Sequence, residues 1–116
     1  MHHNKRQVKR AHLIYYLRIF DSVTHREIGH LVDLSSQGMM IISEEPIPAG
    51  KELSCTMELP VPIDGCHEIA FTANCRWCKK DYNPAYYLSG CRFEDIRSEE
   101  VETIKYLINT FGFKRK

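Results

Sequence analysis

Two arginines near the start of the sequence, Arg6 and Arg10, have a spacing that suits binding of a phosphorylated ligand. Residues four apart lie on one side of the chain, about 6 Å apart in a helix or roughly 13 Å apart in a strand. Arginine presents a planar fork of donors. This fork fits a phosphate group, or the O6 and N7 acceptors on one edge of guanine. The pair therefore predicts recognition of phosphate or guanine.

A second polar group lies between two apolar runs, where residues 32–42 read VDLSSQGMMII. Two interpretations are open. Asp, Ser and Gly favour tight turns through local hydrogen bonds or positive φ, so the stretch can be a simple hairpin connection. Asp33 and Ser35 also share one face at a strand end, and a carboxylate can accept the N–H donors on the other edge of guanine. Combined with the arginines, Asp33 predicts a site that reads guanine and phosphate together.

The two patterns in one chain closely resemble the PilZ domain family, which has Arg-x-x-x-Arg followed by Asp-x-Ser-x-x-Gly before an apolar strand. The resemblance extends from Arg6 to about Phe111. Further segments look like the family's later strands, turn and final helix, namely residues 38–42, 46–50, 73–77, 88–93 and 99–111. Gln37 stands where many members have another glycine. This departure affects the turn rather than the side-chain contacts.

The resemblance implies a mostly β fold, a six-stranded antiparallel Greek-key β-barrel with a C-terminal amphipathic α-helix. It also implies binding of the bacterial second messenger cyclic di-GMP. We expect a flexible basic N-terminal arm over residues 1–11, and the barrel with its helix over residues 12–113. The implied ligand-binding residues are Arg6 and Arg10 on the arm, with Asp33, Ser35 and Gly38 on the barrel, while Lys5 and Ser36 are weaker candidates.

Short strand-like segments separated by turn signals fill the sequence between residues 12 and 94, which independently indicates a sandwich or barrel. The expected strands are residues 12–20, 27–34, 39–43, 52–59, 68–79 and 85–93. The sequence then changes to helical spacing, with an apolar stripe at Val101, Ile104, Leu107, Ile108 and Phe111. We expect Ser98 to cap the start of this helix and Gly112 to end it.

Length and composition describe one ordinary globular domain of 116 residues, with 43% apolar and 27% charged residues. No run is long enough for a transmembrane helix, and no signal peptide is visible, so we expect a cytoplasmic protein without membrane insertion. The net charge of +1 is unevenly distributed. Residues 1–20 and 114–116 carry eight positive charges and no acid, which leaves residues 21–113 at −7. Basic ends of this kind suggest an anionic partner.

The five cysteines are an odd number and are expected to be reduced thiols. Cys75 and Cys78 have the spacing of a zinc or redox pair. They fall in an expected strand, however, where residues three apart point to opposite faces, so we predict no metal site. Trp77, between them, is expected in the core or in a pocket wall.

No phosphate-binding loop, nucleophile elbow or catalytic triad is visible, so we predict a binding protein rather than an enzyme, with no cofactor besides its ligand. As a single-domain receptor it would act as an adaptor for a downstream protein, with the arm ordering on binding. Two alternatives remain. One is a PilZ-fold interaction module that does not bind the nucleotide. The other is a small nucleic-acid-binding barrel, which the −7 body disfavours, so no nucleic acid polymer is expected as a partner.

Overall fold

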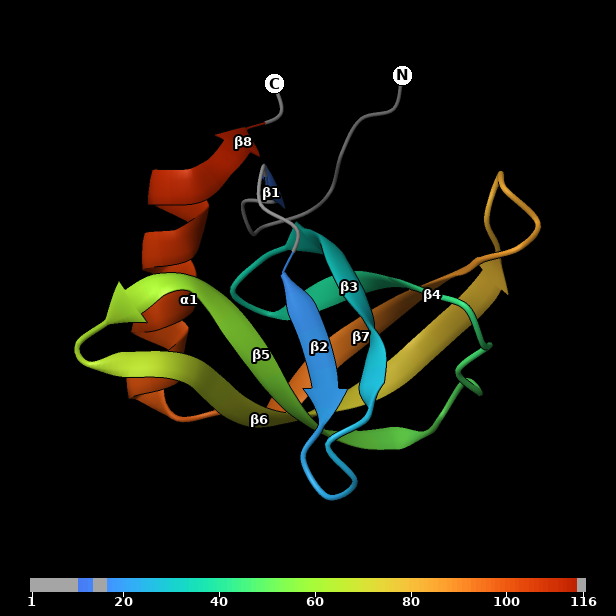
Figure 1. The fold of residues 1–116 in the computed structure, drawn as a ribbon, viewed down its shortest axis with the longest axis horizontal. Helices are drawn as coiled ribbons and strands as arrows, with labels where there is room; N and C mark the ends of the chain where they lie inside the picture. Colours follow the sequence, from blue (N-terminus) through green and yellow to red (C-terminus); the bar gives the residue numbers. More distant parts are fainter. Residues whose placement is uncertain (1–10, 14–16, 115–116) are drawn as a thin grey trace.

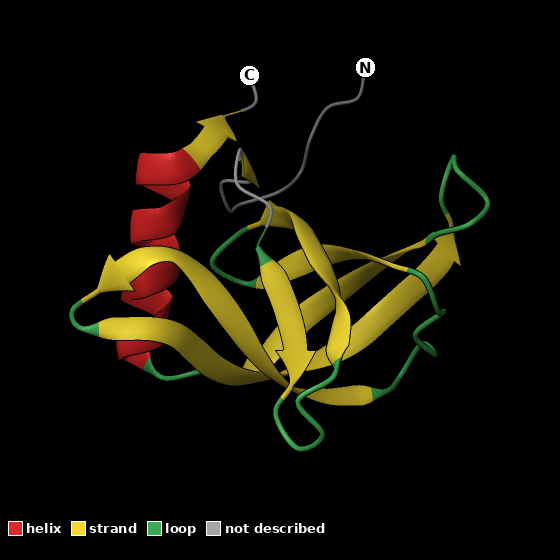
Figure 2. Cartoon of the chain, viewed as in Figure 1, coloured by secondary structure: helices red, strands yellow, loops and turns green. Residues whose placement is uncertain are grey.

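The computed structural model describes residues 11–13 and 17–114, which form one antiparallel sheet and one helix (Figure 1). The strands are β1 (Ala11–Leu13), β2 (Arg18–Asp21), β3 (Glu27–Leu34), β4 (Gly38–Ser43), β5 (Glu52–Ile63), β6 (Cys66–Lys80), β7 (Tyr87–Asp95) and β8 (Gly112–Lys114). The helix α1 (Ser98–Phe111) follows β7. Figure 2 shows how far strands dominate the fold.

Six of the strands close into a barrel. Their order is β2-β5-β6-β7-β4-β3, and β3 pairs again with β2 to complete the circle. The connection from β4 to β5 crosses to the far side of β2, which gives the Greek-key path. β1 and β8 lie outside the circle, with β1 paired to β3 on one side and to β8 on the other. The predicted six-stranded barrel with a C-terminal helix is therefore confirmed.

Alternation along the strands produces the core. In β5, for example, Leu53, Cys55 and Met57 are buried while their neighbours are more exposed, the period expected for a strand with one face inside. Side chains from all six barrel strands and from α1 join one core cluster. Phe71 and Phe93 meet within it edge to face, with ring centroids 4.9 Å apart.

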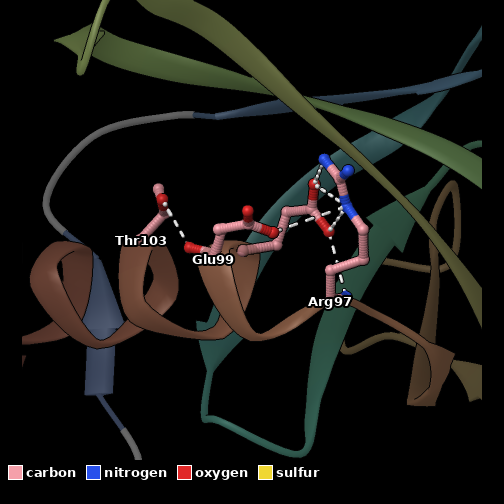
Figure 3. Close-up of polar contacts among 4 residues, drawn as sticks. Arg97, Glu99 and Thr103 are labelled. Carbon is pink, nitrogen blue, oxygen red and sulfur yellow. Dashed lines mark hydrogen bonds and ion pairs between the residues drawn. The ribbon is translucent and has the colours of Figure 1, made fainter.

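The start of α1 differs from the prediction, because Arg97 rather than Ser98 is the N-cap residue. The backbone N–H of Arg97 donates to Glu100 Oε1 at 3.0 Å, and its guanidinium donates to Glu100 Oε2 at 2.7 Å (Figure 3). The Arg97 guanidinium holds the pKa of the Glu100 carboxyl below its ordinary value. The Glu100 carboxylate, in the first turn, thus accepts both the backbone N–H and the guanidinium of Arg97, which makes Arg97 the cap, one position before Ser98.

The other end of α1 follows the prediction, since Gly112 is the C-cap and its N–H donates to the carbonyl of Ile108. Gly112 is extended, with φ −85° and ψ 145°, so it continues directly into β8. The apolar stripe faces the barrel, with Ile104, Leu107 and Ile108 buried. No helix among the described residues has the length and apolar character to cross a bilayer.

Two local features were not predicted. Residues 12–20 were expected as one strand, whereas β1 and β2 are separate elements on either side of residues 14–16, which lie outside the described residues. β8 was not predicted at all. Its three residues pair with β1, with His12 opposite Phe113, so the strand that it pairs with in the described part of the chain comes from the other end of the sequence.

Candidate functional site

The turn between β3 and β4 contains the predicted polar motif, and Ser35 organises it. The Ser35 hydroxyl oxygen accepts hydrogen bonds from the backbone N–H groups of Gln37, at 3.1 Å, and of Gly38, at 3.2 Å. The Ser35 backbone N–H donates to the Gly38 carbonyl at 2.9 Å. Ser35 is nearly buried, with 9% of its surface exposed. The interpretation of this stretch as turn chemistry is therefore confirmed, with the hydroxyl as its centre.

Position 38 requires a glycine because β7 packs too closely for a side chain, and not because of a positive φ. The φ of Gly38 is not positive, unlike those of Gly50 and Gly65. A Cβ at this position would lie 2.3 Å from the carbonyl oxygen of Cys91 and 3.3 Å from the Cα of Arg92. Both are backbone atoms of β7, which cannot rotate away. The glycine thus allows β7 to approach the turn closely, which Phe93 N–H reinforces by donating to the Gln37 carbonyl at 2.9 Å.

Asp33 lies near the end of β3, between two neighbouring strands. It pairs with Met40 of β4 and with His12 of β1. Leu34, the next residue and the last of β3, belongs to the core, so Asp33 projects from the opposite face of the strand. Asp33 is only 3% exposed. A carboxylate at this position is therefore shielded from bulk water. Hydrogen bonds that it accepts in this environment are stronger than they would be in water.

The arginine pair and its neighbour Lys5 lie outside the described residues. The structure does describe Ala11, the residue bonded to Arg10, which lies opposite Leu34. β1 thus begins directly beside the end of β3, where Asp33 is found. Ser36, the weaker candidate in the turn, is partly exposed.

The sheet continues beyond the turn onto β7 and β6, and this surface includes residues that the sequence did not identify. Gly38 lies opposite Arg92, which in turn lies opposite Asn74. On the next rung, Met40 lies opposite Gly90, and Gly90 opposite Trp77. Only the alternation of Arg92 with the apolar residues beside it could have marked Arg92 as an outward-facing residue. The register that brings it to Gly38 is not visible in the sequence.

Trp77 is outside the core, contrary to one of the two expectations for it, with 38% of its surface exposed. Its indole covers Gly90, where an added Cβ would meet the ring nitrogen at 2.3 Å. Lys79 lies 5.5 Å from the ring centroid, a cation–π arrangement. The large ring thus fills the space that glycine leaves on the neighbouring strand.

The predicted orientation of Cys75 and Cys78 is wrong. A bulge between Cys75 and Trp77 adds one residue to β6, so both cysteines face the barrel interior. Burial raises the pKa of the Cys75 thiol and raises that of the Cys91 thiol opposite it to about 12. Such thiols stay protonated and unreactive at neutral pH. Within residues 11–13 and 17–114, no group of three His, Cys, Asp or Glu side chains is placed to hold a metal ion.

A cleft of about 800 Å³ lies at the other end of β3 and β4, between the β2–β3 turn and the chain leading into β5. Its charged lining is mixed, with Glu27, Glu44 and Glu45 near Arg26 and Lys51. None of the predicted site residues that the structure describes lines it. The cleft is therefore separate from the Ser35 turn.

Comparison with known proteins adds a family and several related folds. The family model of the PilZ domain matches residues 4–110. The structure resembles the PilZ domain with c-di-GMP of YcgR from Escherichia coli, with a TM-score of 0.71 at 14% identity, covering 93% of this chain and 92% of that one. It also resembles the K. pneumonia MrkH–c-di-GMP complex (TM-score 0.71, 15% identity, 92% of this chain) and the Bacillus subtilis inhibitor of motility MotI/DgrA (0.69, 17%, 92%).

The chain spans about half the length of the latter two proteins, 52% of MrkH and 51% of MotI/DgrA. At these identities the likeness shows a shared fold. No curated protein matches the sequence.

Proposed function

We propose that this chain, which belongs to the PilZ domain family, is a receptor for the second messenger cyclic di-GMP. One observation carries the proposal. β1, which begins at the residue after Arg10, pairs with the strand that contains Asp33, beside the Ser35–Gly38 turn. The arginine part of the sequence motif therefore leads directly into a strand that neighbours the strand of Asp33. The likeness to structures of YcgR and MrkH that contain c-di-GMP supports the same ligand here.

In the proposed site the carboxylate of Asp33 accepts the N–H donors of a guanine. Arg6 and Arg10 donate to phosphate oxygens, or to O6 and N7 on the opposite edge of the base. Lys5 and Ser36 are secondary candidates. Ser35 contributes by fixing the turn, because its hydroxyl oxygen already accepts two backbone hydrogen bonds. Gly38 contributes by keeping the surface of β4 free of a side chain.

The proposal describes a binding protein rather than an enzyme. The predicted arm, residues 1–11, orders against the domain, residues 12–113, when the ligand holds both arginines. Its last residue, Ala11, is already paired with Leu34 in β1, so the ordering concerns the residues before it. Such ordering uses part of the binding energy, which suits a reversible sensor. The changed surface would then be read by a protein partner. A bacterial cytoplasmic location fits the five cysteines, which are all free thiols.

Isothermal titration calorimetry tests the proposal. We expect saturable binding of cyclic di-GMP, with much weaker binding of GMP and of a short single-stranded oligonucleotide. Arg6→Ala and Arg10→Ala should each weaken binding by about 1.5–3 kcal/mol, the range for hydrogen bonds to charged groups. The matched control is Arg26→Ala, an exposed arginine in the turn at the other end of β3. Absence of binding by the unaltered protein, or equal losses in all three variants, would refute the assignment.

A further inference from the structure

Arg92 faces outward from β7 directly beside the Ser35–Gly38 turn. Its neighbours Cys91 and Phe93 are buried in the core, so Arg92 projects from the opposite face of the strand. Arg92 is exposed, and it lies opposite Gly38 in the β4–β7 register. Because Gly38 has no side chain, no atom of β4 on this rung stands between Arg92 and the turn.

The position of Arg92 is fixed by the same contacts that build the turn. Phe93, the next residue, donates its N–H to the carbonyl of Gln37 at 2.9 Å. The close approach of β7 to Gly38 brings the Arg92 Cα within 3.3 Å of where a Gly38 Cβ would be. The backbone that carries Arg92 is therefore held against the motif by a direct hydrogen bond and close contact, which favours a preorganised binding residue.

The charge of Arg92 is not used within the described part of the chain. Arg18 forms an ion pair with Glu58 at 3.0 Å, and Arg97 forms one with Glu100 at 2.7 Å. Arg92 forms no ion pair or side-chain hydrogen bond with any described residue. The residue beyond it on the rung, Asn74, donates its side-chain amide to the carbonyl of Gly50. With respect to the described residues, the Arg92 guanidinium thus keeps its donors available beside a candidate anion site.

We infer that Arg92 is a third arginine of the nucleotide site, binding acceptor atoms of the ligand from the β7 side. This inference rests on the proposed function. β3 and β7 are separated by β4, so two strand spacings, about 10 Å in all, lie between them. Asp33 lies opposite Met40 and Arg92 lies opposite Gly38, so a ligand held by both crosses β4 diagonally, over Met40 and the glycine that leaves room beside it. The acceptors available to Arg92 there are phosphate oxygens or guanine O6 and N7.

The test compares Arg92→Ala, Arg92→Lys and the control Arg26→Ala by calorimetry with cyclic di-GMP. Arg92→Ala should raise Kd by about tenfold or more, as expected for loss of a hydrogen bond to a charged group. Arg26→Ala should leave Kd unchanged. Arg92→Lys separates the two kinds of acceptor. Retained affinity identifies a phosphate, for which a point charge suffices, and an alanine-like loss identifies the guanine edge, which needs the fork. Melting curves without ligand should coincide for all four proteins, since both arginines are exposed.

A clear result overturns the inference. If the unaltered protein binds cyclic di-GMP and Arg92→Ala binds as tightly as Arg26→Ala, then Arg92 is not part of the site while the proposed function stands. If the unaltered protein does not bind, both proposals fall together. The two failures are therefore distinguishable in one set of titrations.

Discussion

Replacing Gly38 with alanine should destabilise the protein even when no ligand is present. The new methyl group would lie 2.3 Å from the Cys91 carbonyl oxygen, far inside van der Waals contact. That oxygen and the nearby Arg92 Cα are backbone atoms, so no side chain can move aside to make room. β4 and β7 would have to separate at the point where the Ser35 turn is attached to β7.

The size of the effect follows from two contributions. Forcing an extra methyl group into a packed site costs about 1–3 kcal/mol. Separation of β7 from the turn also weakens the bond from Phe93 N–H to the Gln37 carbonyl, and a typical hydrogen bond contributes about 0.5–1.5 kcal/mol. We therefore expect a loss of about 2–4 kcal/mol in the free energy of unfolding. For a domain of this size, at about 4 °C per kcal/mol, Tm should fall by about 8–16 °C.

Thermal and urea denaturation of the ligand-free protein, followed by circular dichroism, measure this loss. The control is Gln37→Ala, in the same turn, because the Gln37 side chain is exposed and only its backbone carbonyl bonds to β7. This control should stay within about 0.5 kcal/mol of the unaltered protein. A Gly38→Ala variant as stable as the control would refute the close-contact argument and leave only a ligand-related reason for the glycine.

Four further predictions concern the ligand site, the Ser35 turn, the arm and the helix. Asp33→Asn should weaken cyclic di-GMP binding more than Ser35→Ala, because the amide replaces an acceptor with a donor that faces guanine donors; equal binding of cyclic di-AMP by the unaltered protein would exclude the guanine-reading role. Ser35→Ala should instead lower ligand-free stability, by about 0.5–1.5 kcal/mol for each turn hydrogen bond lost. Amide exchange should slow in residues 5–12 at saturating ligand, with a smaller effect near residues 33–38, and unchanged rates in residues 5–12 would contradict arm ordering. Because the folded-state pKa of Glu100 lies below its ordinary 4.5, its stabilising effect is present above that pH and is lost on acidification. The Tm difference between the unaltered protein and Glu100→Gln should therefore shrink from pH 7 to pH 3, and a constant difference would contradict this role.

The barrel strands could be predicted because each carries its own pattern. Alternating burial along β3, β4 and β5 follows the alternation of residue types, and turn residues mark the breaks between strands. Asp64-Gly65 is an example, since both residues have positive φ in the tight turn from β5 to β6. These signals are local, so one sequence was enough to read them.

Features that depend on contacts between distant segments could not be predicted in this way. The reason for glycine at position 38 is a carbonyl fifty-three residues later, and nothing near Gly38 in the sequence indicates it. The bulge that turns Cys78 inward is likewise set by the pairing of β6 with β7. Arg92 joins the candidate site through the β4–β7 register. Sequence patterns identify which residues face outward, but the strand order decides which of them meet.

The position of β1 shows why this distinction matters for the proposed mechanism. Its three residues lie between β3, which carries Asp33, and β8, which continues directly from α1. A ligand that holds the arginines against Asp33 restrains the chain immediately before Ala11, the first residue of β1. Any gain in β1 order then extends to β8, because β1 is the strand with which β8 pairs. On the proposed mechanism, the effect of the ligand on β1 would therefore reach β8, the strand that continues directly from α1.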